Sequence, residues 1–196
     1  MHHIYHTEGF IVSSRPNGEA NMILGIFTKE LGMVDASVQA MREIRSKLRM
    51  GLSDLTFSDL SLVRGKNIWK ITGASSCYNL FECFRDDRVK MDVAANIAAL
   101  LKRMLSGEEK NKEMFILIAS GFEWLKEERL SEREVKNFEA VMVMRILNFL
   151  GYAGDKLKFE EFLRGAEWSR EILDNMAKKR TEALKEINVW LKESQL

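Results

Sequence analysis

The pattern of apolar and polar residues divides the chain into two parts with different periods. Up to about residue 78, short apolar runs are separated by turn residues, as expected for β-strands. From about residue 87 onward, apolar residues recur three and four positions apart, as expected for amphipathic helices. The sequence therefore predicts an α+β protein with a β domain at residues 1–78 and an all-α domain at residues 79–196.

Five short strands are predicted in the first part, at residues 5–14, 21–28, 33–38, 55–63 and 68–72. The sequence Arg-Pro-Asn-Gly at 15–18 predicts a tight turn, because proline presets one backbone dihedral and glycine supplies a positive one. A polar turn at 29–32 joins the second and third strands as a hairpin. Five strands in this arrangement fit an OB-fold (oligonucleotide/oligosaccharide-binding) β-barrel, although five strands also build other small barrels.

Four long helices are predicted in the second part. The first contains Val93, Ile97 and Leu101 and ends at Ser106-Gly107, and the second runs from about 115 to 125. Ser131, followed three residues later by Glu134, forms a capping box that opens a third helix at 135–150. The last helix covers about 168–193, with an expected apolar face of Ile172, Met176, Leu184, Ile187 and Leu191.

Composition and charge narrow the class of protein only slightly. The chain has 196 residues, 46% of them hydrophobic, and a net charge of +1. Residues 1–78 carry nine Lys/Arg and seven Asp/Glu, whereas residues 79–196 carry 21 and 22. Two cysteines make no disulfide framework, no apolar run reaches the length of a membrane span, and the first ten residues lack the apolar core of a secretory signal. We expect a protein of the reducing cytoplasm that does not enter membranes.

Positive charge is concentrated in one segment after the hairpin. Arg42, Arg45, Lys47 and Arg49 stand within eight residues, offset only by Glu43. Such a basic loop at the rim of a sheet is typical of contacts to the phosphate backbone of nucleic acids. Further candidates for nucleic-acid binding lie in strands and turns, namely Arg64, Lys66, Arg15 and Lys70. The alternative is that these cations are solvated surface residues without a ligand.

Aromatic residues on the predicted strands are candidates for stacking on bases. We expect Trp69 and Phe57 in this role, because OB folds hold single strands on exposed rings. The alternative is that both rings belong to the barrel core, as we expect for Phe10 and Phe27.

Enzyme chemistry has little support in the sequence. All three histidines stand among the first six residues, so no Ser-His-Asp arrangement can form without the terminus. The phosphate loop of ATPases is absent as well. We therefore expect no catalytic residues and no cofactor.

The order of these motifs resembles the bacterial recombination mediator family RecO. The similarity is carried by TEGFIVSSRPNGEANMILGIFTKELG at 7–32, by the basic segment, and by LSLVRGKN at 60–67. Within the first stretch stand a Gly-Glu turn and a Leu-x-x-Phe-Thr-x-x-x-Gly hairpin, here Gly18, Glu19, Leu24, Phe27, Thr28 and Gly32. In the helical part, Phe138-Glu139 precedes a long apolar helix that ends at Leu150-Gly151-Tyr152.

The resemblance implies an N-terminal OB fold, a helical C-terminal domain and no catalysis. It also implies binding of single- and double-stranded DNA, annealing of complementary strands, and association with RecR and with the C-terminal tail of the single-stranded DNA-binding protein SSB. Such a protein helps to load RecA and would be cytoplasmic and nucleoid-associated. Two departures stand out: residues 153–167 lack the cysteines of the zinc module found in many relatives, so no metal is expected, and Ala40 replaces the usual glycine before the basic loop.

An acidic SSB tail would need an apolar pocket rimmed by cations. The helical part offers two candidate rims, one made by Lys102 and Arg103 and the other by Lys178, Lys179 and Arg180. The alternative is that these are solvated helix faces that complement nearby carboxylates.

We therefore predict a recombination mediator in DNA repair that binds DNA without sequence specificity. Two other hypotheses stay open: a non-catalytic protein-interaction adaptor built on the OB barrel, and an OB-fold RNA-binding protein.

Overall fold

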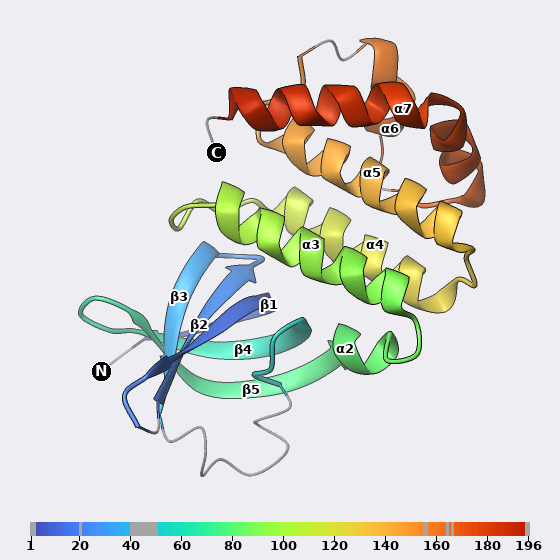
Figure 1. Ribbon diagram of the computed structural model, residues 1–196. Coiled ribbons are helices and arrows are strands. Elements are labelled where there is room, and N and C mark those ends of the chain that lie inside the picture. Colours follow the sequence, from blue (N-terminus) through green and yellow to red (C-terminus); the bar gives the residue numbers. More distant parts are fainter. Residues whose placement is uncertain are drawn as a thin grey trace. The chain divides into compact units, whose positions relative to one another are not determined.

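The computed structural model describes residues 3–19, 21–39, 51–154, 157–163, 165 and 167–194. Five strands precede the helices (Figure 1), as the sequence pattern predicted. The strands are β1 (Ile4–Asn17), β2 (Asn21–Thr28), β3 (Gly32–Val38), β4 (Thr56–Arg64) and β5 (Trp69–Asn79). β5 is longer than predicted because its pairing with β4 continues to Thr56 and Asn79, through small polar residues that give no alternating apolar signal.

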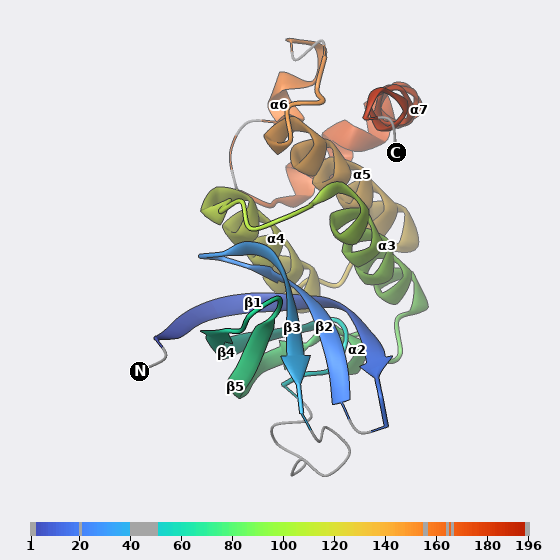
Figure 2. The same cartoon turned by 90° about the vertical axis from the view of Figure 1, so that its left-hand side faces the viewer.

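The strands close into a barrel in the order β1-β2-β3-β5-β4. β3 and β5 pair in parallel, and every other neighbouring pair is antiparallel. β1 is long enough to pair with β2 through one half and with β4 through the other, and it is bent by an irregularity between Ile11 and Ser13. Figures 1 and 2 show this curved β1. The order and the single parallel pair confirm the OB fold.

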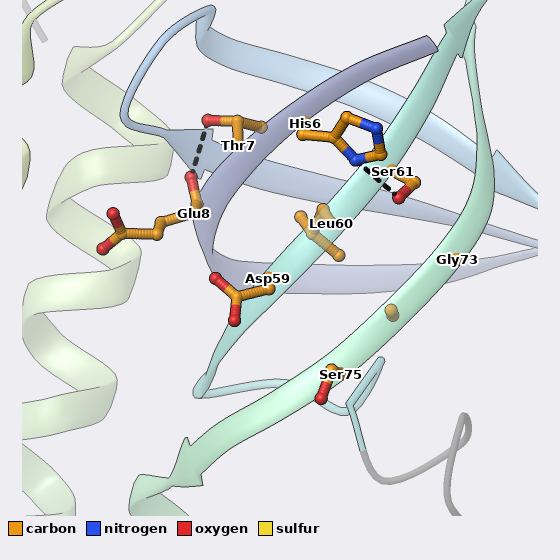
Figure 3. A pocket seen from close by; sticks show the side chains of 9 residues that line it. His6, Thr7, Glu8, Asp59, Leu60, Ser61, Gly73 and Ser75 are labelled. Carbon is orange, nitrogen blue, oxygen red and sulfur yellow. Dashed lines mark hydrogen bonds between the residues drawn. The ribbon is translucent and has the colours of Figure 1, made fainter.

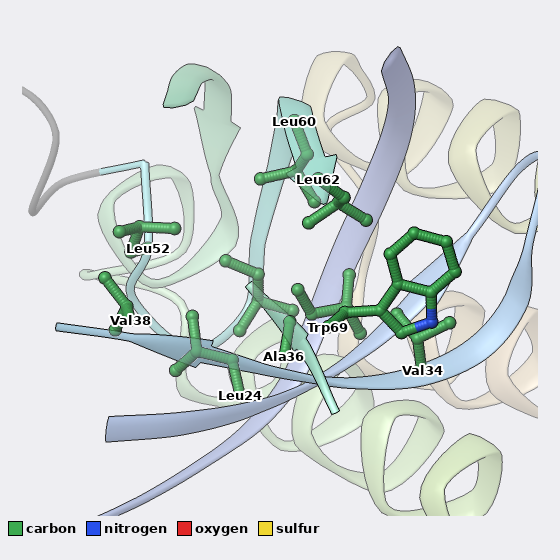
Figure 4. Packing of buried hydrophobic residues seen from close by; sticks show 10 residues of the cluster. Leu24, Val34, Ala36, Val38, Leu52, Leu60, Leu62 and Trp69 are labelled. Atoms are coloured by element: carbon green, nitrogen blue, oxygen red, sulfur yellow. The ribbon is translucent and has the colours of Figure 1, made fainter. Parts of the chain in front are cut away.

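The barrel interior is filled by aliphatic side chains and one indole ring (Figure 4). Alternate residues of each strand point inward, as the period of two requires. The buried cluster consists of Ile11, Leu24, Ile26, Val34, Ala36, Val38, Leu52, Leu60, Leu62 and Trp69. Each buried Ile, Leu or Val side chain of this cluster stabilises the fold by about 1.5–3 kcal/mol relative to exposure.

Part of the outer barrel wall is buried by a second, aromatic layer. Phe10 stacks on Phe57 at a centroid distance of 4.4 Å, and Phe57 stacks on Tyr78 at 4.8 Å. Phe115 lies 5.6 Å from Phe27 and 6.2 Å from Phe57. Because β2 is covered on both faces, its apolar run is continuous instead of alternating.

The helices are α2 (Leu80–Cys83), α3 (Arg88–Met104), α4 (Lys112–Glu127), α5 (Glu132–Phe149), the 3₁₀-helix η1 (Leu157–Phe159), α6 (Glu160–Leu163) and α7 (Arg170–Glu193). The four long helices were predicted, whereas the short α2, η1 and α6 were not. The predicted capping box is confirmed: Ser131 N donates to Glu134 Oε2 at 2.7 Å, and Glu134 N donates to Ser131 Oγ at 3.4 Å. Among the described residues, no helix combines the length and apolar character that a membrane crossing needs.

Two compact units are present. One contains residues 1–86 together with 94–115, and the other contains 87–93 together with 116–196. The break points lie inside α3 and α4, so this division differs from the boundary after residue 78 that the sequence suggested. The domain boundary after residue 78 therefore stays a prediction.

In the second unit, α5 packs against α7. Asn137 donates to the Leu173 carbonyl at 3.1 Å, and Arg180 donates to the Lys136 carbonyl at 2.6 Å. The apolar face of α7 agrees with the expected one only in part: Met176 and Ile187 are buried as expected, and the other buried residues are Leu173, Ala183 and Trp190. Leu184, expected to be buried, is exposed. Both sets have helical spacing, so only the packing partner α5 distinguishes them.

Candidate nucleic-acid interface

Two of the predicted cations lie in one row across the barrel wall. Arg15 on β1 pairs with Ile23 on β2, Ile23 pairs with Ser37 on β3, and Ser37 pairs with Lys70 on β5. Residues directly opposite each other on neighbouring strands project to the same side of the sheet. Arg15 and Lys70 are both exposed and stand three strand spacings apart, about 14 Å along the sheet.

Arg15 pairs with a carboxylate outside this row. Its Nη2 lies 3.1 Å from Asp35 Oδ2, and both side chains are largely solvent-exposed. Gly25 lies on β2, the strand between β1 and β3, and pairs with Ser13 on one side and with Asp35 on the other. It has no side chain that could separate Arg15 from Asp35. An exposed pair of this kind contributes roughly 0–1 kcal/mol, so the guanidinium can exchange Asp35 for another anion at little cost.

The other two cations flank the turn between β4 and β5. Arg64 ends β4 and Lys66 follows it, and the turn closes with Gly65 N donating to the Ile68 carbonyl at 3.1 Å. A Cβ at Gly65 would stand 3.6 Å from Lys70 Cε, so the Lys70 side chain runs along the same turn. Within the described residues, neither Lys66 nor Lys70 takes part in an ion pair. The structure therefore brings Arg64, Lys66 and Lys70 together at this turn.

Arg64 is held by a carboxylate that the sequence did not suggest. It forms an ion pair with Glu108, and its guanidinium lies over the Trp69 ring at 4.9 Å from the centroid. Trp69 Nε1 donates to the other oxygen of Glu108 at 3.0 Å. The Glu108 carboxylate thus accepts hydrogen bonds from both Arg64 and Trp69. Glu108 lies 39 positions after Trp69 in the sequence.

Glu108 belongs to residues 105–111, here termed the connecting segment, which joins α3 to α4. Met33 N donates to the Gly107 carbonyl at 3.2 Å, and Lys110 and Lys112 both pair with Glu30 in the hairpin turn. A Cβ at Gly32 would stand only 2.4 Å from the Glu109 carbonyl oxygen. The connecting segment therefore lies directly on the β2–β3 turn.

Acidification is expected to weaken the Glu108 contact. Burial tends to raise the pKa of Glu108, but the hydrogen bonds from Arg64 and Trp69 and the Arg64 charge outweigh it and hold the pKa below its ordinary value of 4.5. A depressed carboxylate pKa stabilises the fold above the unfolded-state pKa and loses this effect as pH falls through the folded-state value. The difference in unfolding free energy between wild type and Glu108→Gln should therefore be present at pH 7, at about 0.2–1 kcal/mol, and be lost as the pH falls through the lowered folded-state pKa. Parallel urea titrations measure it, and a constant difference across this range would contradict the assignment.

The basic segment itself, Arg42, Arg45, Lys47 and Arg49, lies outside the described residues. The chain enters it after Val38 and Gln39 and leaves it before Leu52. Val38 and Leu52 belong to the barrel core, and Ser37 is the strand partner of Lys70. The role of these four residues in DNA binding stays a prediction.

Both predicted stacking residues are core residues, which corrects that assignment. Trp69 and Phe57 are each only 5% exposed. Trp69 points into the barrel, and Phe57 lies in the outer aromatic layer between Phe10 and Tyr78. The ring that does reach solvent beside the β4–β5 turn is Tyr5, which is 38% exposed and stands edge-on to Trp69 at 5.1 Å. Tyr5 is a single aromatic residue near the start of β1, and no motif around it indicates a role in stacking.

A groove of about 550 Å³ lies over β1, β4 and β5 (Figure 3). Its lining includes the carboxylates of Glu8 and Asp59 and contains no lysine or arginine. His6 Nδ1 lies 3.0 Å from Ser61 Oγ at one side of it. The negative charge makes this groove unsuited to phosphate, so the nucleic-acid candidate is the set of cations on β1, on β5 and at the β4–β5 turn.

Comparison with known proteins identifies the family of this fold. A family model described as "Recombination protein O N terminal" matches residues 1–80, and one described as "Recombination protein O C terminal" matches residues 85–155. The chain belongs to the RecO family. Both matched regions follow the order in which the motifs appear in the sequence.

Several curated RecO proteins align with most of this chain. The DNA repair protein RecO of Heliobacterium modesticaldum is 32% identical over 122 residues, which are 62% of this chain and 44% of that protein. For Dehalococcoides mccartyi strain CBDB1 the identity is 31% over 160 residues, 81% of this chain and 60% of the relative. For Thermodesulfovibrio yellowstonii it is 29% over 154 residues, 77% and 59%. The chain thus spans about half of the length of these RecO proteins.

The two cation rims inferred from the RecO resemblance have different surroundings. Lys102 and Arg103 are exposed in the last turn of α3, in the unit that contains the barrel. In the other unit, Lys179 pairs with Glu161 at 2.7 Å, and Arg180 donates to Lys136 and Asn137. Lys178 is exposed and donates to Asn175 Oδ1 at 3.1 Å. Arg180 therefore has a structural role between α5 and α7, and the tail-binding role of all five residues stays a prediction.

In the parts of the chain that the structure describes, no group of three or more His, Cys, Asp or Glu side chains is placed to hold a metal ion.

Proposed function

We propose that this RecO-family protein binds single- and double-stranded DNA without sequence specificity and anneals complementary strands. The observation that carries the proposal is the set of exposed cations on the OB barrel, Arg15, Lys70 and Lys66, on one row and one adjoining turn. OB folds bind strands over β2–β3 and the adjoining β1–β2 and β4–β5 loops. Lys66 lies in the β4–β5 loop, Lys70 lies near the start of β5 just after it, and Arg15 lies near the end of β1, before the β1–β2 loop. The protein acts without catalysis and without a cofactor.

The mechanism follows from what point charges can recognise. Lysine and arginine on a barrel wall neutralise backbone phosphates and displace condensed counterions, and this contact is independent of base sequence. Neutralised strands repel each other less, so two complementary strands can approach. Their base edges stay free to pair, because the protein holds only phosphate.

The wider role is proposed from the family. In DNA repair and recombination, the protein would act with RecR, contact the acidic tail of SSB through its helical part, and help to load RecA at SSB-coated gaps. Its place would be the cytoplasm, with the nucleoid. The relatives named above support this role by their name, "DNA repair protein RecO".

The salt dependence of binding tests the role of the described cations. We expect Lys66→Ala/Lys70→Ala to reduce the slope of log affinity for single-stranded DNA against log salt by about 1.4, because each neutralised phosphate contributes about 0.7. Annealing of two complementary fluorescent strands should slow in parallel. The matched control is Lys185→Ala/Lys192→Ala, which removes the same charge from exposed positions of α7. Equal slopes for the two double variants would contradict the barrel as the binding surface.

The basic segment is tested in the same way. Arg42/Arg45/Lys47/Arg49→Ala, verified as folded by circular dichroism, should lower the salt slope by up to about 2.8 and abolish annealing. Wild-type protein that neither binds DNA nor anneals strands at low salt would overturn the proposed function.

A protein-interaction adaptor is the second candidate function, and the acidic groove over β1, β4 and β5 is the observation that favours it. Salt-sensitive DNA binding distinguishes the mediator from this adaptor. A preference for RNA over DNA of the same sequence would favour an RNA-binding role.

A further inference from the structure

We propose that Arg64, Trp69 and Tyr5 form a subsite for one nucleotide of a single strand, in which the Glu108 carboxylate occupies the place of a phosphate. The inference rests on the proposed function and adds to it a location and a means of regulation. It assigns two residues, Tyr5 and Glu108, that the charge pattern of the sequence left unnoticed.

The cation of this subsite is oriented before any ligand arrives. The Arg64 guanidinium lies over the Trp69 ring at 4.9 Å, and the ring is fixed because it is buried in the barrel core (Figure 4). Stacking on an indole restricts the planar fork of arginine to one orientation while leaving its N–H groups free to donate. With 57% of its side chain exposed, Arg64 is accessible from solvent.

Glu108 shows where an anion binds. One carboxylate oxygen accepts from Arg64 Nη1 and the other accepts from Trp69 Nε1 at 3.0 Å. Two non-bridging phosphate oxygens present the same pair of acceptors, and arginine recognises both groups through the same fork. The Glu108 side chain is 42% exposed, and exposed ion pairs contribute little to stability, so a phosphate can displace it.

A stacking surface stands beside this anion position. Tyr5 contacts Trp69 edge-on at 5.1 Å, and His3 contacts Tyr5 edge-on at 4.5 Å. Tyr5 is therefore next to the one ring that touches both Arg64 and Glu108. A base bound on Tyr5 and its phosphate bound on Arg64 belong to one nucleotide or to adjacent ones. Because duplex bases are already stacked on each other, such a site selects single strands.

Glu108 consequently acts as a competitor built into the connecting segment. As long as its carboxylate occupies Arg64, the subsite is closed to phosphate. We expect Glu108→Gln, which keeps an acceptor for the Trp69 indole but removes the charge, to bind a 12-residue thymidine strand roughly threefold to tenfold more tightly than wild type. The matched control is Glu109→Gln, which removes the same charge from the neighbouring exposed position and should change the affinity less than about twofold.

Arg64 should account for the gain. In the double variant Arg64→Ala/Glu108→Gln, the tighter binding should disappear, because the cation that the released site offers to phosphate is gone. If instead the double variant keeps the whole gain, the effect of Glu108 is a general charge effect and the subsite is overturned.

Tyr5 is tested with a readout that responds to bases only. Tyr5→Ala should weaken binding of the thymidine strand at least about fivefold and leave binding of an abasic strand of equal length unchanged, whereas Tyr5→Phe should behave like wild type. An unfolded variant would weaken both strands equally, so this comparison separates lost stacking from lost structure. If Tyr5→Ala weakened binding of both strands equally, no base would stack on Tyr5 and this part of the subsite would be wrong.

The failure of this inference differs from the failure of the proposed function. If the wild type binds DNA and the Glu108→Gln and Glu109→Gln variants bind it with identical affinities, the subsite is overturned and the proposed DNA binding stands. If neither wild type nor Glu108→Gln binds DNA at low salt, both proposals are overturned together.

Discussion

Alanine at Gly32 is expected to lower the free energy of unfolding of the barrel unit by roughly 2–4 kcal/mol. Gly32 has a φ of 73°, where an L-residue costs about 1–2 kcal/mol, and its missing Cβ is what lets the Glu109 carbonyl approach. An added methyl group at 2.4 Å from a backbone oxygen forces the connecting segment off the hairpin turn. Equilibrium unfolding in urea measures the loss, and a fall of the melting temperature by about 2–4 °C per kcal/mol should accompany it.

Gly18 provides the matched control for this substitution. Its φ of 77° is nearly the same, but no atom lies within 4 Å of a Cβ built there. Gly18→Ala should therefore show the backbone cost alone, about 1 kcal/mol. Equal losses for Gly18→Ala and Gly32→Ala would mean that the connecting segment does not press on the turn as described.

Replacement of Arg145 by alanine is expected to destabilise the helical unit by roughly 3–5 kcal/mol. Arg145 is buried in α5, where Nε donates to the Phe162 carbonyl at 2.8 Å and Nη2 donates to the Glu167 carbonyl at 3.2 Å. Its guanidinium also lies 4.4 Å from the centroid of the Trp168 ring. Alanine leaves two carbonyls without this donor and a cavity against the indole, and each effect lowers stability.

The protonation state of Arg145 does not weaken this expectation. Burial lowers the pKa of its guanidinium to about 10, so the side chain is still charged at neutral pH and all its N–H groups can donate. Arg145→Met, which keeps most of the volume but none of the donors, should fall between wild type and alanine. Exposed Arg133 on the same helix is the control, with a change below about 0.5 kcal/mol for Arg133→Ala. Equal losses at positions 133 and 145, measured by thermal unfolding, would contradict the structural role.

Much of the fold was predictable because its signals are local. The turn predicted at 29–32 lies between β2 and β3, whereas the turn predicted at 15–18 begins only at Gly18, because Arg15, Pro16 and Asn17 continue β1 and pair with β2. The capping box of Ser131 and Glu134 likewise depends on four consecutive residues and is present as expected. The family could be suspected from the sequence for the same reason, since each of its motifs is a short run in a fixed order.

The candidate site was less predictable because its contacts connect distant residues. Arg64 and Lys66 were selected by charge, but charge alone does not reveal that Glu108 occupies Arg64. Trp69 and Phe57 are aromatic residues on strands, and such a position is compatible with either face of a barrel. For Phe57 the outcome depends on Phe115, a residue of α4 that covers the outer wall.

By itself, the sequence determined the class of the five strands and the four long helices, the OB-type succession of strands, and the family, because turn chemistry, capping and apolar periodicity act within a few residues. Only the tertiary structure decided which residues beside Met176 and Ile187 complete the buried face of α7, which rings are core and which reach solvent, and which carboxylate meets Arg64. These outcomes depend on which partner covers a surface. Barrel closure and helix packing bring that partner from tens of residues away, beyond the range of any local pattern.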